Sequence, residues 1–346
     1  MPATRCHGEE VNNYEKMAKH PDLVIIAGSG RPSNKAGFLV SAKTLCQASH
    51  ILRALVHRCR ARRSPARRTI LRLPNDEPRS FRIILGILHN RSEAVPLEPS
   101  ITDLYYILLS VAKYNLSKII RPWAPYWLTC ARNADPSENA VLLFIAWQLG
   151  DANLVLSQIN HWIKHAIDTK DGLATRHGQP FSRRPVVAEM DACRRIVRVR
   201  RYLVERALNL WHTTINGLKH DYDTEADNYP FPVVADLKVD QPCTAFVLGC
   251  LVQHEWKTIG DTLPTDHRDY SGQVYLLAKL ITGAQDGGSH FCTRPMDVHH
   301  HCRYFRLVAR MKREYARVVG EAMGGLSREW EMELAHKAKL TGSMMR

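Results

Sequence analysis

Residues 69–88 read TILRLPNDEPRSFRIILGIL, and a strand pattern changes to a helix pattern within them. Apolar side chains alternate with others over Thr69–Leu73, which is the period of a half-buried β-strand. Pro74 stops the strand, and Pro78 then suits the first turn of a helix, where its missing N–H would be unpaired anyway. The apolar residues from Phe81 onward recur three and four positions apart, which predicts an amphipathic helix.

The residues before this stretch predict a β-hairpin and a broken helix. Asp22–Gly28 is a short aliphatic run that ends at a Gly-Ser-Gly turn, and Phe38–Val40 is a second apolar run after the loop. Residues 41–55 carry apolar side chains at helical spacing, with a break expected near Ser49. Residues 1–20 are polar, and we expect them to be frayed.

The residues after the stretch predict helices. Ser100 and Asp103 form a capping-box pattern, and 186–219 reads as one long helix. Residues 221–242 read as an acidic, proline-bearing loop, and most of 243–341 is again helical. The predicted fold class is therefore α+β, with short strands and a helical cluster followed by an all-helical C-terminal region. The side chains expected to be buried together in the first domain are Phe81, Leu85, Leu108, Ala112 and Trp127.

Composition and charge narrow the class of protein. The chain has 346 residues, of which 45% are hydrophobic and 24% are charged, as in ordinary globular proteins. Its net charge of +14 favours acidic partners. It has no apolar run that could span a bilayer, no hydrophobic leader, and nine cysteines too scattered for a disulfide scaffold. We therefore expect an intracellular protein, in the cytoplasm or the nucleus, with reduced thiols and no membrane partner.

Several short stretches in a fixed order resemble a known family. They are Leu73–Pro78 with Phe81, then Ala112–Tyr114, then Arg121–Trp123 with Trp127 and Leu128. Their order and spacing resemble the BTB/POZ domain of filamentous-fungal proteins.

The resemblance implies three regions in the chain. Residues 1–20 are then a flexible N-terminus, 21–128 the BTB/POZ domain, and 129–346 a helical C-terminal region. The last region also resembles the helical parts of those fungal proteins, in which a Trp-x-x-Gly-Asp sequence, here Trp147–Asp151, follows the BTB domain.

BTB/POZ domains are protein–protein docking modules, so the resemblance implies a non-catalytic scaffold or adaptor. Such domains often self-associate through an apolar face, which implies a homodimer. Some act as adaptors for cullin-type ubiquitin ligases and carry an apolar-x-Glu motif between the second helix and the third strand. Residues 56–68 contain no acidic residue, so the sequence disfavours a cullin-type partner. The residues that the resemblance places at the dimer face are Leu23, Ile25, Leu39 and Leu45.

An arginine-rich insert occupies the same interval. Arg53–Arg68 holds seven arginines and no carboxylate, and because unpaired charges are costly to bury, we expect an exposed loop. Three interpretations stay open: an inert solvated loop, a nuclear-import signal, or contact with nucleic acid. The last is the alternative function, a nuclear nucleic-acid- or chromatin-associated factor. The residues that would act in it are Arg58, Arg60, Arg62, Arg63, Arg67 and Arg68.

A second basic stretch, Arg194–Arg201, lies within the long predicted helix. Its five arginines leave an aliphatic stripe free for packing. The heptads that a bZIP helix would need do not follow it. We interpret these arginines as the solvated face of a packed helix.

Cysteine and histidine gather in the segment 283–302. Cys292, His299 and Cys302 carry the thiolate and imidazole groups that zinc prefers, but their spacing is looser than that of paired CxxC sequences. The segment is too polar and glycine-rich to be held by burial alone, so either neighbouring helices or a zinc ion must hold it. We expect no metal, and if zinc binds, these three residues are its predicted ligands.

The common catalytic sequence patterns are absent. The chain has no GxSxG, no HExxH and no phosphate-binding GK[ST] loop. Gly28-Ser29-Gly30 follows a predicted strand but lacks the third glycine of a dinucleotide site. We therefore expect a protein that is not an enzyme, binds no cofactor and acts through protein partners.

Overall fold

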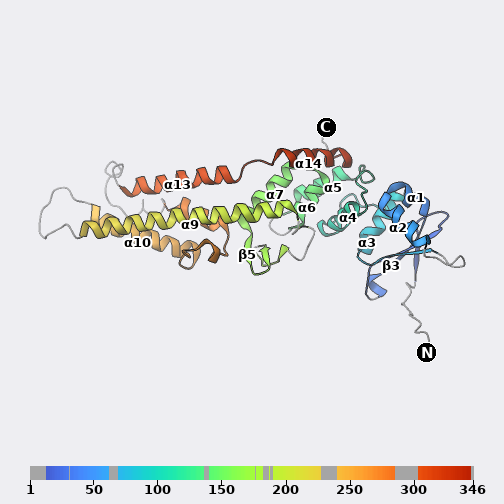
Figure 1. Cartoon of the computed structure of the whole chain (residues 1–346), viewed down its shortest axis with the longest axis horizontal. Helices are drawn as coiled ribbons and strands as arrows, with labels where there is room; N and C mark the ends of the chain where they lie inside the picture. The colour runs from blue at the N-terminus through green and yellow to red at the C-terminus, as the bar shows by residue number, and fades with distance from the viewer. Residues whose placement is uncertain are drawn as a thin grey trace, which may run out of the picture. The chain divides into compact units, whose positions relative to one another are not determined.

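The structure is a computed structural model, and it describes residues 13–30, 32–61, 69–135, 140–175, 177–181, 187, 190–226, 240–284 and 303–343. The chain forms two compact units. Unit 1 comprises Met1–Leu156 and Leu326–Arg346, and unit 2 comprises Ser157–Gly325. Figure 1 shows short strands near the N-terminus and helices after them, which confirms the α+β class. The domain boundary expected at residue 128 stays a prediction of the family resemblance.

Unit 1 begins with a four-stranded sheet of order β1–β3–β2–β4. The predicted hairpin is confirmed, because β2 and β3 pair antiparallel, and β4 lies parallel to β2 on its other side. Strand β1 lies within the N-terminal residues expected to be frayed, and that prediction is wrong for it, because its backbone pairs with β3. The strands are β1 (Tyr14–Lys16), β2 (Leu23–Ala27), β3 (Ala36–Val40) and β4 (Thr69–Leu73).

The helices of unit 1 begin where the sequence offers caps. Ser49 breaks the first helical stretch in two, as predicted, and its hydroxyl accepts the Leu52 N–H at 3.1 Å. The Glu77 carboxylate caps α3, and Ser100 caps α4. The helices are α1 (Ala42–Ala48), α2 (His50–Ala61), α3 (Pro78–Leu88), α4 (Ile101–Lys113), α5 (Ala124–Asn133), α6 (Val141–Leu149) and α14 (Arg328–Thr341), with short 3-10 turns η1 (Pro32–Asn34) and η2 (Ser92–Ala94).

The predicted core of the first domain is confirmed in four of its five residues. Phe81, Leu85, Leu108 and Trp127 are each 0% exposed. Ala112 is exposed, so that prediction is wrong, and Val111 is buried in its place. Both lie within a turn of Leu108, and the phase of α4 turns the nearer one inward.

The Trp-x-x-Gly-Asp sequence positions the C-terminal helix α14 against α6. The Trp147 ring meets the Trp330 ring edge-on, with centroids 5.5 Å apart. Gly150 ends α6 in the left-handed conformation at φ 80°, and a Cβ there would lie 2.3 Å from the Ala338 backbone nitrogen. The Asp151 carboxylate accepts the N–H of Leu154, at the start of α7 (Ala152–His165), at 2.9 Å. Each of the three residues therefore has a structural role.

Gly150→Ala should lower the free energy of unfolding by about 3 kcal/mol, because the left-handed backbone and the close approach of α14 both exclude a methyl group. Gly30→Ala is the matched control, because Gly30 also has a positive φ of 81° but has no atom near the position of a Cβ. Urea unfolding followed by tryptophan fluorescence measures both. Equal losses for the two variants would show that α14 does not approach Gly150 closely.

In the residues that the structure describes, unit 2 is helical except for one short hairpin. Strands β5 (Ile167–Thr169) and β6 (Gly172–Ala174) pair antiparallel, so the prediction of an all-helical C-terminal region is wrong there. The long predicted helix is confirmed as α9 (Asp191–Ala226), but it continues into residues expected to form a loop. Figure 1 shows α10 and α13 running along α9. The other elements are α10 (Asp240–Ile259), η4 (His267–Asp269), α11 (Val274–Gly283) and α13 (Arg303–Ala322).

A bilayer-spanning helix is not found in the described part of the chain, where every helix is too short or too polar.

Candidate interaction site

Two of the sequence stretches that resemble the BTB/POZ family meet at one buried carboxylate. Asp76 follows β4 and is 4% exposed. It accepts hydrogen bonds from the Tyr114 hydroxyl at 2.8 Å and from Lys113 Nζ at 2.7 Å. The Tyr114 backbone oxygen in turn accepts from the Ser49 hydroxyl at 2.6 Å. The end of α4 is thereby fixed to the turn before α3 and to the start of α2.

Because of this contact, unit 1 should lose stability as the pH rises into the alkaline range. Burial, followed by the charge of Asp76 and the hydrogen bond to it, raises the pKa of Tyr114. A tyrosine with a raised folded pKa contributes stability below its unfolded pKa of about 10 and loses that contribution as pH rises through the folded value. Urea midpoints measured between pH 8 and 11.5 should therefore fall above pH 10, and less steeply in Tyr114→Phe. Identical profiles would contradict this role.

A groove lies on the solvent side of α3, between that helix, the end of η2 and the start of α4. We call it the α3 groove, and its volume is about 320 Å³. Apolar side chains and charged side chains both line it. The apolar members are Ile83, Ala94, Pro96 and Pro99, and the charged members are Arg79, Arg82, Glu98 and Asp103.

Two of these four charged side chains already have a polar partner. Arg82 forms a salt bridge with Glu15 at 2.7 Å, and the Asp103 carboxylate, which keeps its charge, accepts the Ser100 hydroxyl at 2.7 Å. Among the described residues, Arg79 and Glu98 have no hydrogen-bonded or ion-paired side chain. Arg79 and Glu98 are therefore the two charged side chains of the groove that no other described side chain engages, and they lie beside an apolar surface.

The groove adjoins an exposed apolar side chain on the loop before α4, and α5 packs against that loop. The Trp127 indole N–H donates to the Pro96 oxygen at 2.9 Å, which fixes α5 against that loop. Burial and then the charge of Glu98 raise the pKa of Cys130 on α5. Leu97 lies between Pro96 and Glu98, which both line the groove, and it is 51% exposed; Tyr126 on α5 is 54% exposed. This surface has the apolar and charged parts of a protein-docking site.

The predicted dimer face is wrong for three of its four residues. Leu23, Ile25 and Leu45 are at most 2% exposed and belong to the chain's own core. Leu39 is half-buried. An apolar strand in a small sheet has the same sequence pattern whether its own helices or a second subunit covers it. The homodimer itself stays a prediction, which light scattering at micromolar concentrations would test.

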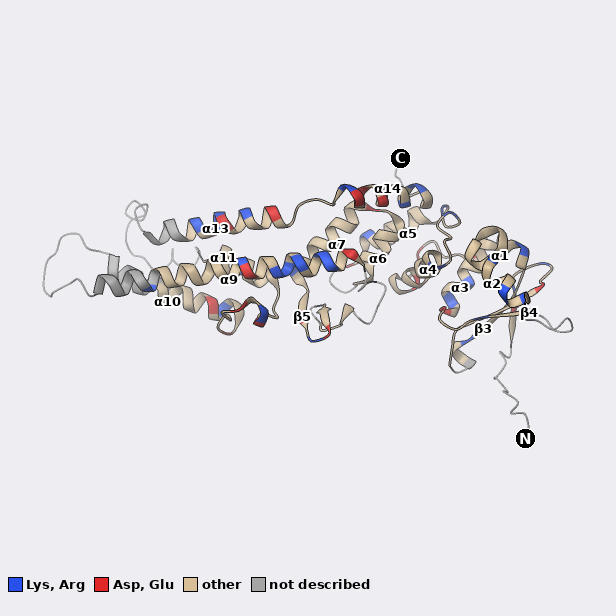
Figure 2. Ribbon diagram, in the orientation of Figure 1, with Lys and Arg blue, Asp and Glu red and all other residues tan. Residues whose placement is uncertain are grey.

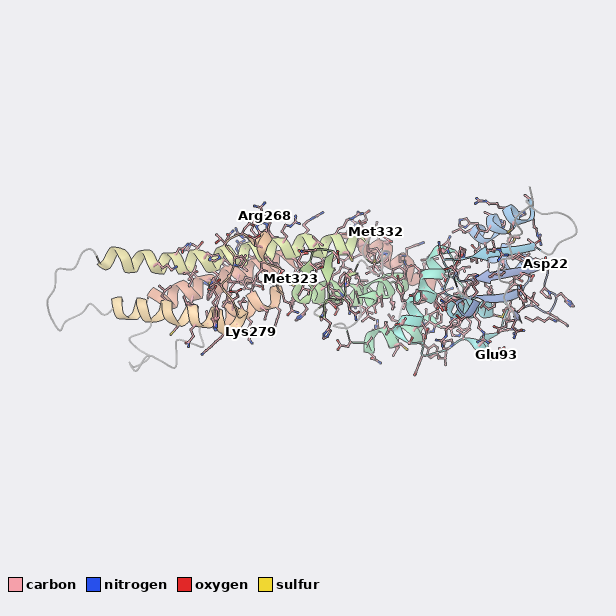
Figure 3. All side chains as sticks on the ribbon, turned by 90° about the horizontal axis from the view of Figure 1, so that it is seen from below. Asp22, Glu93, Arg268, Lys279, Met323 and Met332 are labelled. Carbon is pink, nitrogen blue, oxygen red and sulfur yellow. The ribbon has the colours of Figure 1, made fainter. Side chains whose placement is uncertain are left out.

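The arginine-rich insert begins as a helix rather than as the expected loop. Arg58 and Arg60 lie on α2, whose Leu52 and Val56 are buried. Both arginines are exposed, as predicted, and Arg60 pairs at 2.9 Å with Asp22, which is labelled in Figure 3. The import and nucleic-acid interpretations of the insert stay predictions. The members that lie outside the described residues are Arg62, Arg63, Arg67 and Arg68.

The predicted zinc ligands Cys292, His299 and Cys302 also lie outside the described residues. Within the described part of the chain, no group of three or more histidine, cysteine or acidic side chains could hold a metal ion. A zinc site in the segment 283–302 therefore stays a prediction.

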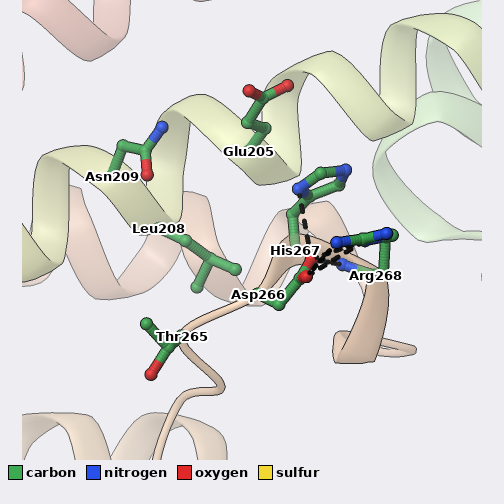
Figure 4. A pocket seen from close by; sticks show the side chains of 7 residues that line it. All are labelled: Glu205, Leu208, Asn209, Thr265, Asp266, His267 and Arg268. Atoms are coloured by element: carbon green, nitrogen blue, oxygen red, sulfur yellow. Dashed lines mark hydrogen bonds and ion pairs between the residues drawn. The ribbon is translucent and has the colours of Figure 1, made fainter.

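Unit 2 carries a second pocket, of about 380 Å³, between α9 and the loop that leads into η4 (Figure 4). Three of its polar side chains, Asp266, His267 and Arg268, contact one another. Two nitrogens of the Arg268 guanidinium donate to the carboxylate of Asp266 and, together with the Arg268 backbone N–H, lower the pKa of Asp266 to about 2. Glu205 and Asn209 line the opposite wall from α9. Because the carboxylate of Asp266 is already paired, the pocket leaves Glu205 as its main free charge.

Comparisons of the chain with protein-family models, with curated proteins and with solved structures found no match. The BTB/POZ resemblance accordingly rests on the sequence stretches quoted above.

Sequence reasoning missed the groove itself. The sequence pattern at Ser100 and Asp103 indicates only a helix cap, and no pattern points to Arg79 or Glu98. The one local signal is the pair of prolines at 96 and 99, which keeps the loop extended before α4. Three segments must fold together before these residues form one surface.

Proposed function

We propose that the chain is a non-catalytic scaffold or adaptor and that unit 1 contains a protein-docking module of the BTB/POZ type. The observation that carries the proposal is the contact at Asp76, which joins two of the stretches that resemble the family. The sheet also supports it, because a hairpin is followed by two helices and a strand parallel to β2, and then by α3, α4 and α5.

The α3 groove, with Leu97 beside it, is the docking surface in this proposal. Protein interfaces combine an apolar centre with a polar rim, and the groove has apolar side chains among charged ones. Its free charges define the partner. The occupant is an extended segment of another protein, with an apolar side chain between an acidic residue that meets Arg79 and a basic residue that meets Glu98.

Affinity capture with charge-exchanged variants tests the proposal. The tagged full chain is compared with a double variant, Arg79→Glu with Glu98→Lys, which leaves the net charge unchanged. The matched control is Glu333→Lys with Lys339→Glu on α14, where both side chains are also exposed. Circular dichroism establishes that all three proteins are folded.

A partner that the wild-type chain enriches should also be enriched by the α14 control, and its recovery should fall at least tenfold with the groove variant. Undiminished recovery with the groove variant would contradict the docking surface. If the wild-type chain enriched no protein over an unrelated bait, the adaptor function itself would be contradicted.

A further inference from the structure

The arginines of α9 fall into two groups that the sequence does not separate. Arg195 donates to the backbone between α13 and α14, at 2.8 and 3.0 Å. Arg200 is 4% exposed and donates to the backbone oxygens of Ile163 and Gly272. Arg206 forms an ion pair with a glutamate of α13 at 3.6 Å. These three arginines hold the helices and loops of unit 2 together.

Arg194, Arg198 and Arg201 form the second group and are exposed. They are spaced four and three residues apart, so they lie on one face of α9 and span about 10 Å along it. They are among the blue bands of α9 in Figure 2. Arg194 forms an ion pair with Asp191 at 2.9 Å, but this pair is exposed and therefore contributes little to stability. Among the described residues, Arg198 and Arg201 have no ion-paired or hydrogen-bonded side chain.

Two partly exposed apolar side chains flank this line of charge. Val197 is 38% exposed and Tyr202 is 39% exposed. At about 100° per residue, Val197 lies roughly 60° to one side of Arg194 and Tyr202 roughly 80° to the other. Interfaces between proteins have the opposite arrangement, with apolar residues in the centre and charges at the rim. A central line of charge with an aromatic ring beside it suits a polyanionic strand that carries flat groups on one side.

We propose that this face of α9 binds the phosphate backbone of single-stranded nucleic acid, with a base stacked on Tyr202. We call it the α9 stripe; it consists of Arg194, Arg198, Arg201 and Tyr202. Guanidinium groups suit this ligand, because their planar fork can donate two hydrogen bonds to one phosphate.

The stripe has a defined end. One turn after Arg201, Glu205 lines the pocket of Figure 4, and its carboxylate would repel a strand of phosphates there. Glu205→Gln should therefore tighten binding by roughly two- to threefold. This inference concerns unit 2 and does not depend on the docking surface of unit 1.

Fluorescence anisotropy of a labelled 20-nucleotide oligouridine tests the proposal on the full chain, at 25 to 200 mM salt. Each phosphate contact to a single strand contributes about 0.7 to the slope of log affinity against log salt. In Arg198→Ser with Arg201→Ser, affinity at low salt should fall at least tenfold, and the slope should become shallower by about 1.4. Tyr202→Ala should weaken binding roughly tenfold and leave the slope unchanged, because stacking releases no counterions.

The matched control is Arg310→Ser with Arg313→Ser on α13, which removes the same charge from two exposed positions. It should lower affinity less than twofold. Equal losses for the two double variants would show attraction by net charge alone and would overturn the proposal. It would also be overturned if polyglutamate displaced the oligouridine at the same charge concentration as unlabelled oligouridine, because the ligand would then be an acidic protein segment.

Discussion

Asp76→Ala is expected to lower the free energy of unfolding of unit 1 by about 3 kcal/mol. The substitution removes the acceptor of the Tyr114 hydroxyl, and Tyr114 is 0% exposed, so that hydroxyl loses its partner without gaining water. It also removes the ion pair with Lys113. The Lys113 side chain is 42% exposed and can return to solvent, so the loss is smaller than for a fully buried ion pair.

Urea unfolding followed by tryptophan fluorescence measures this effect. Asp76→Asn keeps an acceptor for Tyr114 and should lose less than Asp76→Ala. Glu15→Ala is the control, because the pair of Glu15 with Arg82 is partly exposed and should contribute less than about 1 kcal/mol. If Asp76→Ala lowered the free energy of unfolding no more than Glu15→Ala, the buried contact would not hold α4 to the turn before α3.

Leu85→Ala is expected to destabilise unit 1 by roughly 2–5 kcal/mol, because the surrounding side chains cannot fully collapse into the space that it leaves. Leu85 is 0% exposed and lies on α3 in the same core as Phe81 and Leu108. Leu97→Ala is the control, since Leu97 is 51% exposed and its truncation should change stability little. A loss below about 1 kcal/mol in the same urea experiment would place Leu85 outside the core.

Local signals in the sequence were sufficient to predict most of the elements of unit 1. The alternation over Thr69–Leu73, the break at Ser49 and the cap at Ser100 each depend on a few neighbouring residues, and all three are confirmed. It is harder to predict which side chains of α4 face the core, because Val111 and Ala112 are both apolar and lie three and four positions after Leu108. Only the packing of the whole helix decides between them.

The hairpin of unit 2, the predicted dimer face and the α3 groove could not be predicted from short stretches of sequence. Strands β5 and β6 are three residues each, too short for an alternating pattern to stand out. Leu23 and Ile25 have the sequence pattern of a strand that a second subunit could cover, but both are buried within the chain itself. The α3 groove combines residues from 79 to 103, and its charges become meaningful only once Arg82 has paired with Glu15.

The arginines of α9 show the same limit. The sequence contains one basic run, and its interpretation as a solvated face is right for Arg198 and Arg201. It is wrong for Arg200, which is buried against backbone oxygens of two other segments. Neighbouring positions on a helix point in directions about 100° apart, so adjacent arginines can have opposite environments.

Amide hydrogen exchange of the full chain, with and without the protein that it captures, tests the central claim most directly. If the α3 groove is the docking surface, bound partner should slow exchange in residues 79–103, and the exchange of α9 and α13 should not change. Slowed exchange confined to other segments, with residues 79–103 unaffected, would contradict the assignment of this groove as the docking site.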